Sequence, residues 1–288
     1  MDARPDPRGA GAMVLASILS VQCGAALATS IFDEVGPAGT VLLRSLFAAV
    51  VLWAVARPSL RLRRERLADV LLFAVTLAGM NLCFYEAIDR LPLGVAVTLE
   101  FVGPLAVAVL GSRRRRDLLW AAAAAAGIVL LAEGGFGGGS DTVGLLLALG
   151  AGAFWGAYIL LGARLGRGDP GLGGLALAMA ASTVLTAPLG IAEGGADLLV
   201  ATTLAVGLGV GVLSSAIPYG LELVALRRLP QAVFGVLLSL EPAVAALIGF
   251  LVLSQDLAAT ELGGIALVVV ASAGALGSAR GTPAPRDG

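Results

Sequence analysis

The sequence contains no histidine and no lysine, and it has two cysteines, Cys23 and Cys83. Without histidine the chain cannot build a Ser-His-Asp or Cys-His catalytic site, or a metal site that depends on histidine. Both cysteines lie inside apolar runs, and two isolated cysteines form neither a disulfide framework nor a CxxC pair. We therefore expect no metal, no cofactor and no enzymatic activity.

Charged residues are also scarce. They make up 14% of the 288 residues, compared with about 25% in an ordinary soluble domain, whereas hydrophobic residues reach 58% and glycine adds 40 positions. A water-soluble fold cannot hide so much apolar surface, so a soluble enzyme, a nucleic-acid-binding protein and a disordered protein are excluded. A transmembrane helix needs about 20 apolar residues, and the composition therefore predicts roughly ten helices in a lipid bilayer.

The apolar runs divide the chain into ten candidate spans. Polar or glycine-rich segments separate them, and we expect residues 1–11 and 280–288 to be disordered tails and residues 134–141 to be a glycine-rich loop. That loop lacks the lysine of a phosphate-binding loop. The predicted spans are residues 12–32, 36–56, 68–88, 91–111, 117–133, 142–162, 172–192, 199–222, 232–252 and 262–279.

The arginines predict the orientation of these spans. When the connecting segments are numbered alternately, one set of segments carries seventeen of the nineteen arginines, including the run from Arg113 to Arg116. The other set carries Arg90 and eight acidic residues, Asp33, Glu34, Asp89, Asp141, Glu193, Asp197, Asp256 and Glu261, and Arg44 lies inside a span. Because basic residues stay on the cytoplasmic side, the pattern predicts ten spans with both termini in the cytoplasm of a cell-membrane protein.

The chain also contains an internal repeat. The segment from Ala87 to Gly111 aligns without a gap on the segment from Ala225 to Gly249, with nine of 25 residues identical. The repeat predicts two halves, residues 12–133 and 142–279, each with five spans. Five is an odd number, so the halves cross the membrane in opposite directions. Inverted repeats of this kind are typical of transporters that work by alternating access.

Several polar residues fall at membrane depth, where a charge costs free energy and usually faces a cavity or a partner. Arg44, Glu100 and Glu241 lie near the middle of spans. One hypothesis is that Arg44 binds a substrate carboxylate and a buried glutamate binds its ammonium group. The alternative is that the glutamates pair with Arg44 or cap broken helices. The candidate pathway residues are Gln22, Arg44, Asn81, Glu100, Trp155, Tyr158, Tyr219, Glu222 and Glu241.

Structural roles remain open for the other candidates. Trp155 and Tyr158 share one side of a span and could simply pack, and Glu222 could lie at the membrane interface. Proline inside a span removes a backbone hydrogen bond and kinks the helix, and we expect such kinks at Pro104, Pro218 and Pro242.

Four segments carry a family resemblance. GMNLCFYEAIDRLPLGVAVTLEFVGPLAVA (Gly79 to Ala108) and SSAIPYGLELVALRRLPQAVFGVLLSLEPAVAAL (Ser214 to Leu247) resemble the EamA family of the drug/metabolite transporter superfamily. The opening SVQCGAALATSIFDEVGPAGTVLLR (Ser20 to Arg44) and LALGAGAFWGAYILLGARLG (Leu147 to Gly166) resemble its threonine/homoserine exporter branch. The resemblance implies ten helices around a central cavity and ion-driven export of small metabolites, with amino acids as the expected substrates.

We therefore predict an all-α membrane protein that exports a small molecule, with protons as the expected coupling ion, the lipid bilayer as its surroundings and no nucleic-acid partner. The alternative substrate is another metabolite or a drug-like amphipathic compound. An intramembrane enzyme would need a nucleophile paired with a base, and we find no such motif in this sequence. A receptor or scaffold would be expected to have extramembrane domains, and the segments between the predicted spans are too short for them. The sequence does not determine an oligomeric state.

Overall fold

The computed structural model describes residues 7–58, 64–110, 117–136, 141–168, 172–226, 229 and 231–278, and within them every regular element is a helix. Apolar residues dominate each helix, and the backbone hydrogen bonds are satisfied within the helix, as a membrane interior requires. The long helices are α1 (Pro7–Thr29), α2 (Phe32–Ala56), α3 (Arg64–Arg90), α6 (Asp117–Phe136), α7 (Thr142–Gly168), α8 (Gly173–Gly194) and α13 (Ala259–Ser278).

Three further rods are built from shorter helices that follow one another. The first joins α4 (Leu93–Glu100) to α5 (Val102–Leu110), and another joins α11 (Gln231–Leu238) to α12 (Glu241–Leu253). The remaining rod runs through α9 (Ala201–Gly211), the π-helix η2 (Val212–Ala216) and α10 (Ile217–Leu226), and the 3-10 turn η1 (Gly195–Leu199) precedes it.

Each interruption comes just before a proline. The break between α4 and α5 lies at Phe101, three residues before Pro104, and Pro242 is the second residue of α12. Pro218 is the second residue of α10, directly after the π-helix. Proline has no amide hydrogen and its ring clashes with the carbonyl four residues earlier, which explains why regular helix stops one turn ahead of it.

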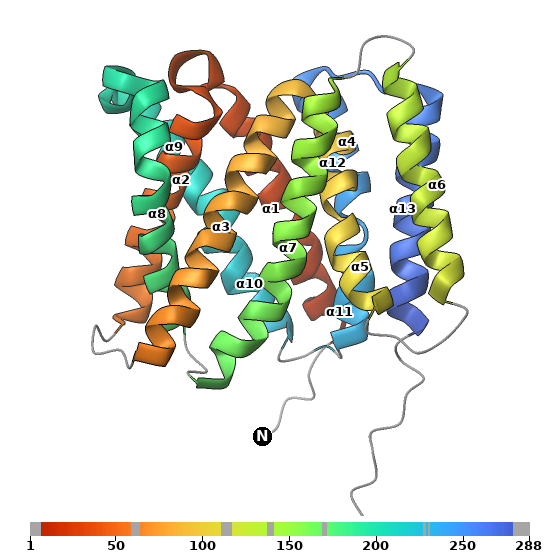
Figure 1. Cartoon of the computed structure of the whole chain (residues 1–288), viewed down its shortest axis with the longest axis horizontal. Helices are drawn as coiled ribbons and strands as arrows, with labels where there is room; N and C mark the ends of the chain where they lie inside the picture. The colour runs from red at the N-terminus through yellow and green to blue at the C-terminus, as the bar shows by residue number, and fades with distance from the viewer. Residues whose placement is uncertain are drawn as a thin grey trace, which may run out of the picture.

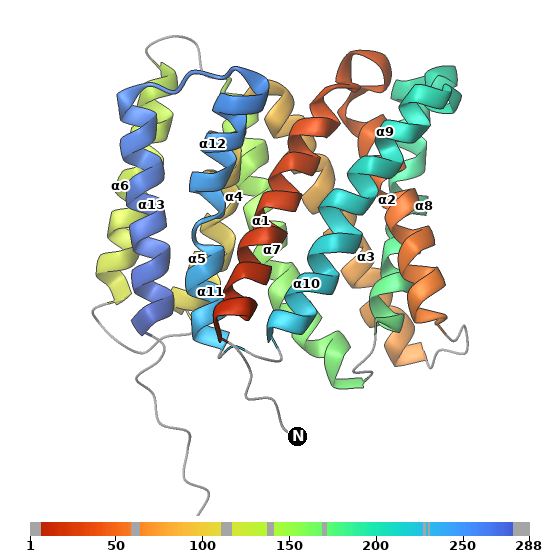
Figure 2. The same ribbon diagram turned by 180° about the vertical axis from the view of Figure 1, so that it is seen from behind.

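The rods stand side by side in a slab. Figure 1 shows α2, α8 and α9 at one end of the slab, α6 and α13 at the other, and α1, α3, α4 and α7 between them. Figure 2 shows from behind how α10, α11 and α12 complete the middle of the slab. The start of α1 and the end of α13 lie at the same, lower face in both views.

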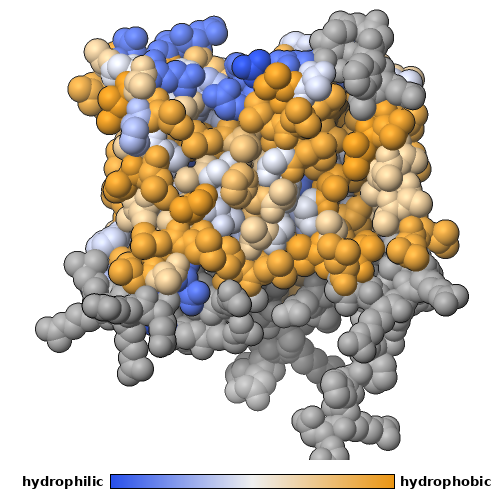
Figure 3. All heavy atoms as spheres, viewed as in Figure 1, coloured by the Kyte–Doolittle hydropathy of each residue, from blue (hydrophilic) through white to orange (hydrophobic). Residues whose placement is uncertain are grey.

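The surface of the slab is apolar around its middle. Large side chains such as Val50, Val184 and Leu251 are more than half exposed on the outer faces of their helices. Figure 3 shows this hydrophobic band, with hydrophilic residues along the upper edge. Six helical segments are long and apolar enough to cross a membrane, and shorter apolar helices occur at 93–107, 118–131, 201–216 and 259–274. The chain is therefore a helical integral membrane protein.

Glycines allow the helices in the middle of the slab to approach closely. A Cβ atom built on Gly94 of α4 would lie 2.7 Å from the Cα atom of Ala246 in α12, and one on Gly152 of α7 would lie 2.6 Å from the carbonyl oxygen of Glu100. The largest buried cluster lies around this crossing and includes Tyr85 and Leu99. Small residues at such contacts are typical of packed membrane helices.

The element boundaries correct the sequence prediction in two places. Residues 7–11, which we expected in a disordered tail, form the start of α1, because Ala10 is buried in a cluster with Ala225 and Phe234. Residues 134–136, which we expected in the glycine-rich loop, continue α6. The tail residues 280–288 lie outside the described residues. One kink was not predicted: α2 is interrupted at Gly36, whose φ of 67° suits glycine.

Candidate functional site

A cavity of about 140 Å³ lies in the middle of the slab, between helices from both ends of the chain. Polar and charged side chains converge on it from α1, α2, α3, α4, α7, α10 and α12. Its lining consists of Val21, Gln22, Arg44, Met80, Asn81, Phe84, Val97, Glu100, Trp155, Tyr158, Ser214, Pro218, Glu222 and Glu241.

The guanidinium group of Arg44 is the cation of this cavity. Its Nη1 donates a hydrogen bond to the hydroxyl of Tyr85 at 3.3 Å, and its Nη2 donates to the backbone carbonyl of Ser214 at 3.3 Å. In a regular α-helix this carbonyl would accept from the amide four residues later, but that residue is Pro218, which has no amide hydrogen. The guanidinium carbon also lies 5.4 Å from the centre of the Tyr85 ring. Arg44 is therefore held in place by neutral groups.

Three carboxylates face the same cavity. Glu100 ends α4 and is partly exposed, Glu241 begins α12 and is 7% exposed, and Glu222 lies on α10. Ser17 donates a hydrogen bond to Glu222 at 2.7 Å. Among the described residues Arg44 forms no ion pair with these carboxylates. The described residues therefore show no direct contact between Arg44 and a glutamate, and Glu241 occupies a helix start, where a negative charge is favourable.

The remaining polar lining is neutral or aromatic. Gln22 of α1 is 2% exposed, and Asn81 of α3 donates from its Nδ2 to the carbonyl of Leu77 at 2.8 Å. Trp155 packs edge-on against Phe101, with the ring centres 5.4 Å apart. The ring of Tyr158 packs at 4.9 Å from that of Phe73. Both aromatic residues thus pack and line the cavity at the same time.

The structure brings eight of the nine candidate residues to this one cavity. The exception is Tyr219, whose backbone lies in α10 and whose side chain is outside the described residues. Their roles in transport stay predictions. Tyr85 and Ser17, which hold Arg44 and Glu222, were not among the candidates. A buried tyrosine and a serine five residues before Gln22 give no distinctive sequence signal, so only their neighbours across the helices reveal them.

Comparison with known proteins places this arrangement in a family. The model of the EamA-like transporter family matches residues 142–277. The chain is 40% identical to the threonine/homoserine exporter RhtA of Salmonella typhimurium (strain SL1344) over 273 residues, 94% of this chain and 92% of the relative. The chain belongs to the EamA-like transporter family. The family predicted from the sequence is thereby confirmed.

One further relative agrees with this assignment, and a solved structure shares the fold. The transporter is 40% identical over 264 residues to the threonine/homoserine exporter RhtA of Escherichia coli (strain K12), which covers 91% of this chain and 89% of the relative. A protein of known crystal structure superposes with a TM-score of 0.66 over 96% of this chain and 99% of its own, at 21% sequence identity. The latter likeness concerns the fold alone.

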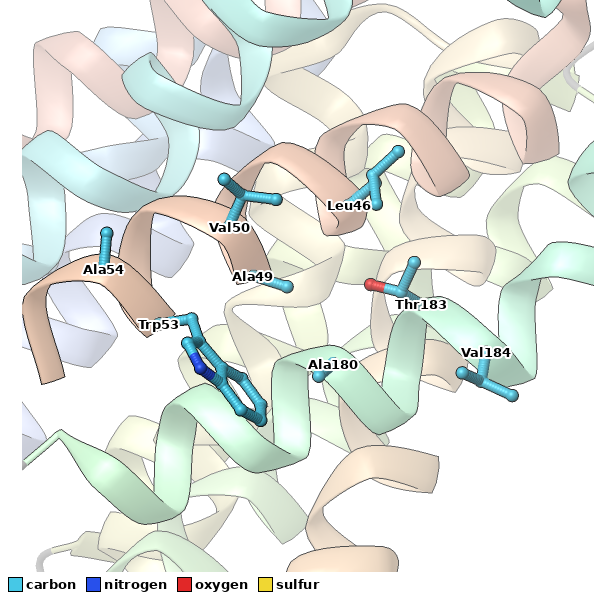
Figure 4. Close-up of a pocket in the computed structure, with 8 residues that line it drawn as sticks. All are labelled: Leu46, Ala49, Val50, Trp53, Ala54, Ala180, Thr183 and Val184. Carbon is cyan, nitrogen blue, oxygen red and sulfur yellow. The ribbon is translucent and has the colours of Figure 1, made fainter. Parts of the chain in front are cut away.

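The transporter has a second, larger hollow of about 480 Å³ between α2 and α8. Figure 4 shows the side chains that line it, from Leu46 and Trp53 on α2 to Ala180 and Val184 on α8. Thr183 supplies its one side-chain hydroxyl, and its Oγ1 already donates to the carbonyl of Met179 at 2.9 Å. This groove lies on the apolar outer surface and offers no charge to a polar ligand.

One ion pair of the transporter lies outside the membrane-spanning core. Arg90, the last residue of α3, donates to Asp141, just before α7, at 2.7 Å, and both side chains are more than 30% exposed. Asp141 also accepts the backbone amide of Val143 at 2.9 Å and thereby caps α7. The hydrogen bond from Arg90 is the main reason that the pKa of Asp141 is lowered below its ordinary value.

Proposed function

We propose that this transporter is a secondary-active exporter of small amino acids, with threonine and homoserine as the expected substrates. The observation that carries the proposal is the cavity, which combines a guanidinium group with carboxylates at the middle of the slab. A free amino acid presents the complementary pair of charges. The names of the RhtA relatives, 40% identical over most of both chains, support the choice of substrate.

The proposed topology has ten spans, two inverted repeats and both termini in the cytoplasm of a bacterial cell membrane. The repeat seen in the sequence is supported by the helix boundaries: a shift of 138 residues, from Ala87 to Ala225, also carries α4 onto α11. The packing supports it too. As α3 packs against α7, so its counterpart, the α9–α10 rod, packs against α1. Such pseudo-symmetry is the basis of alternating access.

Arg44 is the proposed receptor for the substrate carboxylate. Its planar guanidinium group can bind both carboxylate oxygens at once, and it is held by Tyr85 and Ser214 rather than by an acidic residue. A cation at membrane depth without a paired anion is costly, and an anionic substrate group would relieve that cost. Glu100, the carboxylate at the end of α4 that is more open to the cavity, is the proposed partner of the ammonium group.

Glu241 is the proposed proton carrier. It is 7% exposed and, among the described residues, has no cationic partner, so its negative charge is compensated only by the start of α12. A proton from the acidic exterior would neutralise Glu241 and leave on the cytoplasmic side as substrate moves outward. Because Glu241 begins α12 at a break between two helices, a change in its charge acts where the rod can bend.

The test is uptake of labelled threonine and homoserine into everted membrane vesicles with an acidic interior. We expect the pH gradient to drive uptake by the unchanged protein. The Glu241→Gln variant should lose the response to the gradient but keep counterflow, the exchange of labelled for unlabelled threonine, because exchange needs no net proton movement. Glu100→Gln should weaken both, because it removes the ammonium site.

The outcomes separate the parts of the proposal. Gradient-driven uptake that survives in Glu241→Gln would reject Glu241 as the proton carrier. If uptake does not exceed that of vesicles without the transporter, threonine and homoserine are rejected as substrates. That outcome would favour the alternative, export of another metabolite or a drug-like amphipathic compound. Membrane amounts of each variant, measured by immunoblot, are the control.

A further inference from the structure

The side-chain carbonyl oxygen of Gln22 is a buried polar atom without a hydrogen-bond partner among the described residues. Gln22 lies on α1 and is 2% exposed, and its Oε1 has no hydrogen-bond partner among the described residues. Its side chain is nevertheless part of the lining of the central cavity. A buried amide without partners costs free energy, so such a group in a native structure requires an explanation.

The other unsatisfied buried groups of the described residues are serine hydroxyls, of Ser45, Ser182, Ser214, Ser215 and Ser272. A serine hydroxyl in a helix can rotate to bond a carbonyl of the preceding turn, so its apparent lack of a partner carries little meaning. A glutamine amide has no such short route to its own backbone. Ser214 also lines the cavity, but its Oγ faces α1 at Gly24. Gln22 is therefore the exception among the buried polar groups without a partner.

Asn81 provides an internal comparison. It is the other amide of the cavity lining, and its Nδ2 donates to the carbonyl of Leu77 one helical turn earlier. That hydrogen bond fixes the orientation of the Asn81 amide and uses one of its donors. Gln22 has one more methylene group, and its buried Oε1 has no partner among the described residues, so this acceptor remains available to a ligand.

We propose that the amide of Gln22 binds the side-chain hydroxyl of the substrate and so makes the cavity selective for hydroxylated amino acids. This inference rests on the proposed function, in which Arg44 and Glu100 bind the charged ends of the amino acid. A third group in the cavity must then bind the side chain of the amino acid. A hydroxyl donates one hydrogen bond and accepts others, and an amide is the neutral side chain that offers both in return.

The inference explains how one cavity accepts both threonine and homoserine. The two hydroxyls sit on different carbons, and the flexible side chain of Gln22 can follow them. It also predicts which amino acids are rejected. Valine has the shape of threonine with a methyl group in place of the hydroxyl, and its binding would leave the Gln22 amide buried and unpaired. Sites built to bond a hydroxyl reject analogues that lack it far more strongly than apolar pockets reject an extra methylene.

The test is counterflow of labelled threonine in proteoliposomes, with unlabelled threonine or valine as competitor. The unchanged transporter should prefer threonine. In Gln22→Met, which keeps the length of the side chain, the ratio of the half-inhibitory concentrations of valine and threonine should fall by about tenfold, the value expected for one buried hydrogen bond. The change should come from a higher half-inhibitory concentration of threonine rather than from a change in that of valine. Ser272→Ala removes an unpartnered buried hydroxyl of α13 and is the matched control, with an unchanged ratio.

Each result decides between the two proposals. A valine-to-threonine ratio that is the same in Gln22→Met and in the unchanged protein would overturn the role of Gln22. Equal inhibition by valine and threonine in the unchanged protein would overturn hydroxyl selectivity and leave amino-acid export standing. No threonine counterflow at all would reject the proposed function and the hydroxyl site with it. If Gln22→Met does not reach the membrane, Gln22→Asn, which keeps the amide but shortens its reach, should show an intermediate ratio.

Discussion

Arg44 lies in α2 of the first half of the transporter, and the residue 138 positions later, in α8 of the second half, is Ser182. Glu100 at the end of α4 corresponds in the same way to Leu238 at the end of α11. The helix boundaries thus repeat where the charged residues do not. The comparison teaches that the repeat supplies a scaffold with matching breaks, whereas each half contributes its own groups to a single cavity.

The same asymmetry appears where the helices cross. In the first half Gly103 of α5 packs against Gly152 of α7 so closely that a Cβ atom on Gly103 would overlap the backbone of Gly152, and a Cβ atom on Gly152 would lie 2.6 Å from the carbonyl oxygen of Glu100 at the end of α4. The position that corresponds to Gly103 in the second half is Glu241. A tight, side-chain-free contact in one half is therefore matched by a buried carboxylate in the other. Of these two positions, only the one in the second half carries a side chain that can bind or release a proton.

The largest expected effect comes from replacing Arg44, the charged residue whose counterpart in the second half is Ser182. Removing one partner of a buried charge pair typically costs about 2–5 kcal/mol, so Arg44→Gln should weaken threonine binding at least about thirtyfold. Ser182→Ala, at the corresponding position of α8, should leave binding unchanged. The measurement is the threonine concentration that gives half-maximal counterflow in proteoliposomes. Equal values for Arg44→Gln and the unchanged transporter would remove Arg44 from the binding site.

The sequence was sufficient to predict the helical membrane fold and eight of the residues that line the cavity. Arg44, Glu100 and Glu241 could be selected because charges are rare in apolar spans, and rarity is visible without coordinates. The prolines predicted the helix interruptions in the same way, because a proline inside an apolar span is also visible without coordinates. Hydrophobicity gives depth but not rotation about the helix axis. The contacts of Tyr85 with Arg44 and of Ser17 with Glu222 therefore became visible only in the structure.

The pairing of Arg44 also could not be deduced from the sequence. Charge complementarity alone allowed a salt bridge between Arg44 and Glu100, which was one of the open alternatives. Instead, Arg44 donates to the carbonyl of Ser214, which an α-helical amide at position 218 cannot reach because that residue is proline. A competition between a carboxylate and a freed carbonyl depends on the distance between two helices, which no local pattern encodes.

A smaller effect tests the tight crossing of the first half. Gly152→Ala would place a Cβ atom 2.6 Å from the carbonyl oxygen of Glu100, and overpacking of this kind costs about 1–3 kcal/mol. Gly150→Ala, two residues earlier on α7, would place its Cβ atom at an ordinary 3.7 Å from the Sγ of Cys83. We expect a lower thermal unfolding temperature in detergent for Gly152→Ala only. Similar temperatures for the two variants would show that the crossing can relax.

The smallest expected effect concerns the ion pair that joins the end of α3 to the start of α7, between the two halves. Arg90 holds the pKa of Asp141 below its ordinary value, so the stabilisation is present above that value and is lost as the pH falls through the lowered pKa. Asp141→Asn keeps a residue that can cap α7 but removes the charge. We expect a slightly lower unfolding temperature at neutral pH and none of this difference in strong acid or high salt, because exposed pairs are weak and screened.

Asp89→Asn, an exposed carboxylate at the same end of α3, is the control and should not reproduce the pH dependence. A difference for Asp141→Asn that persists in acid would mean that the cap, rather than the ion pair, links the halves.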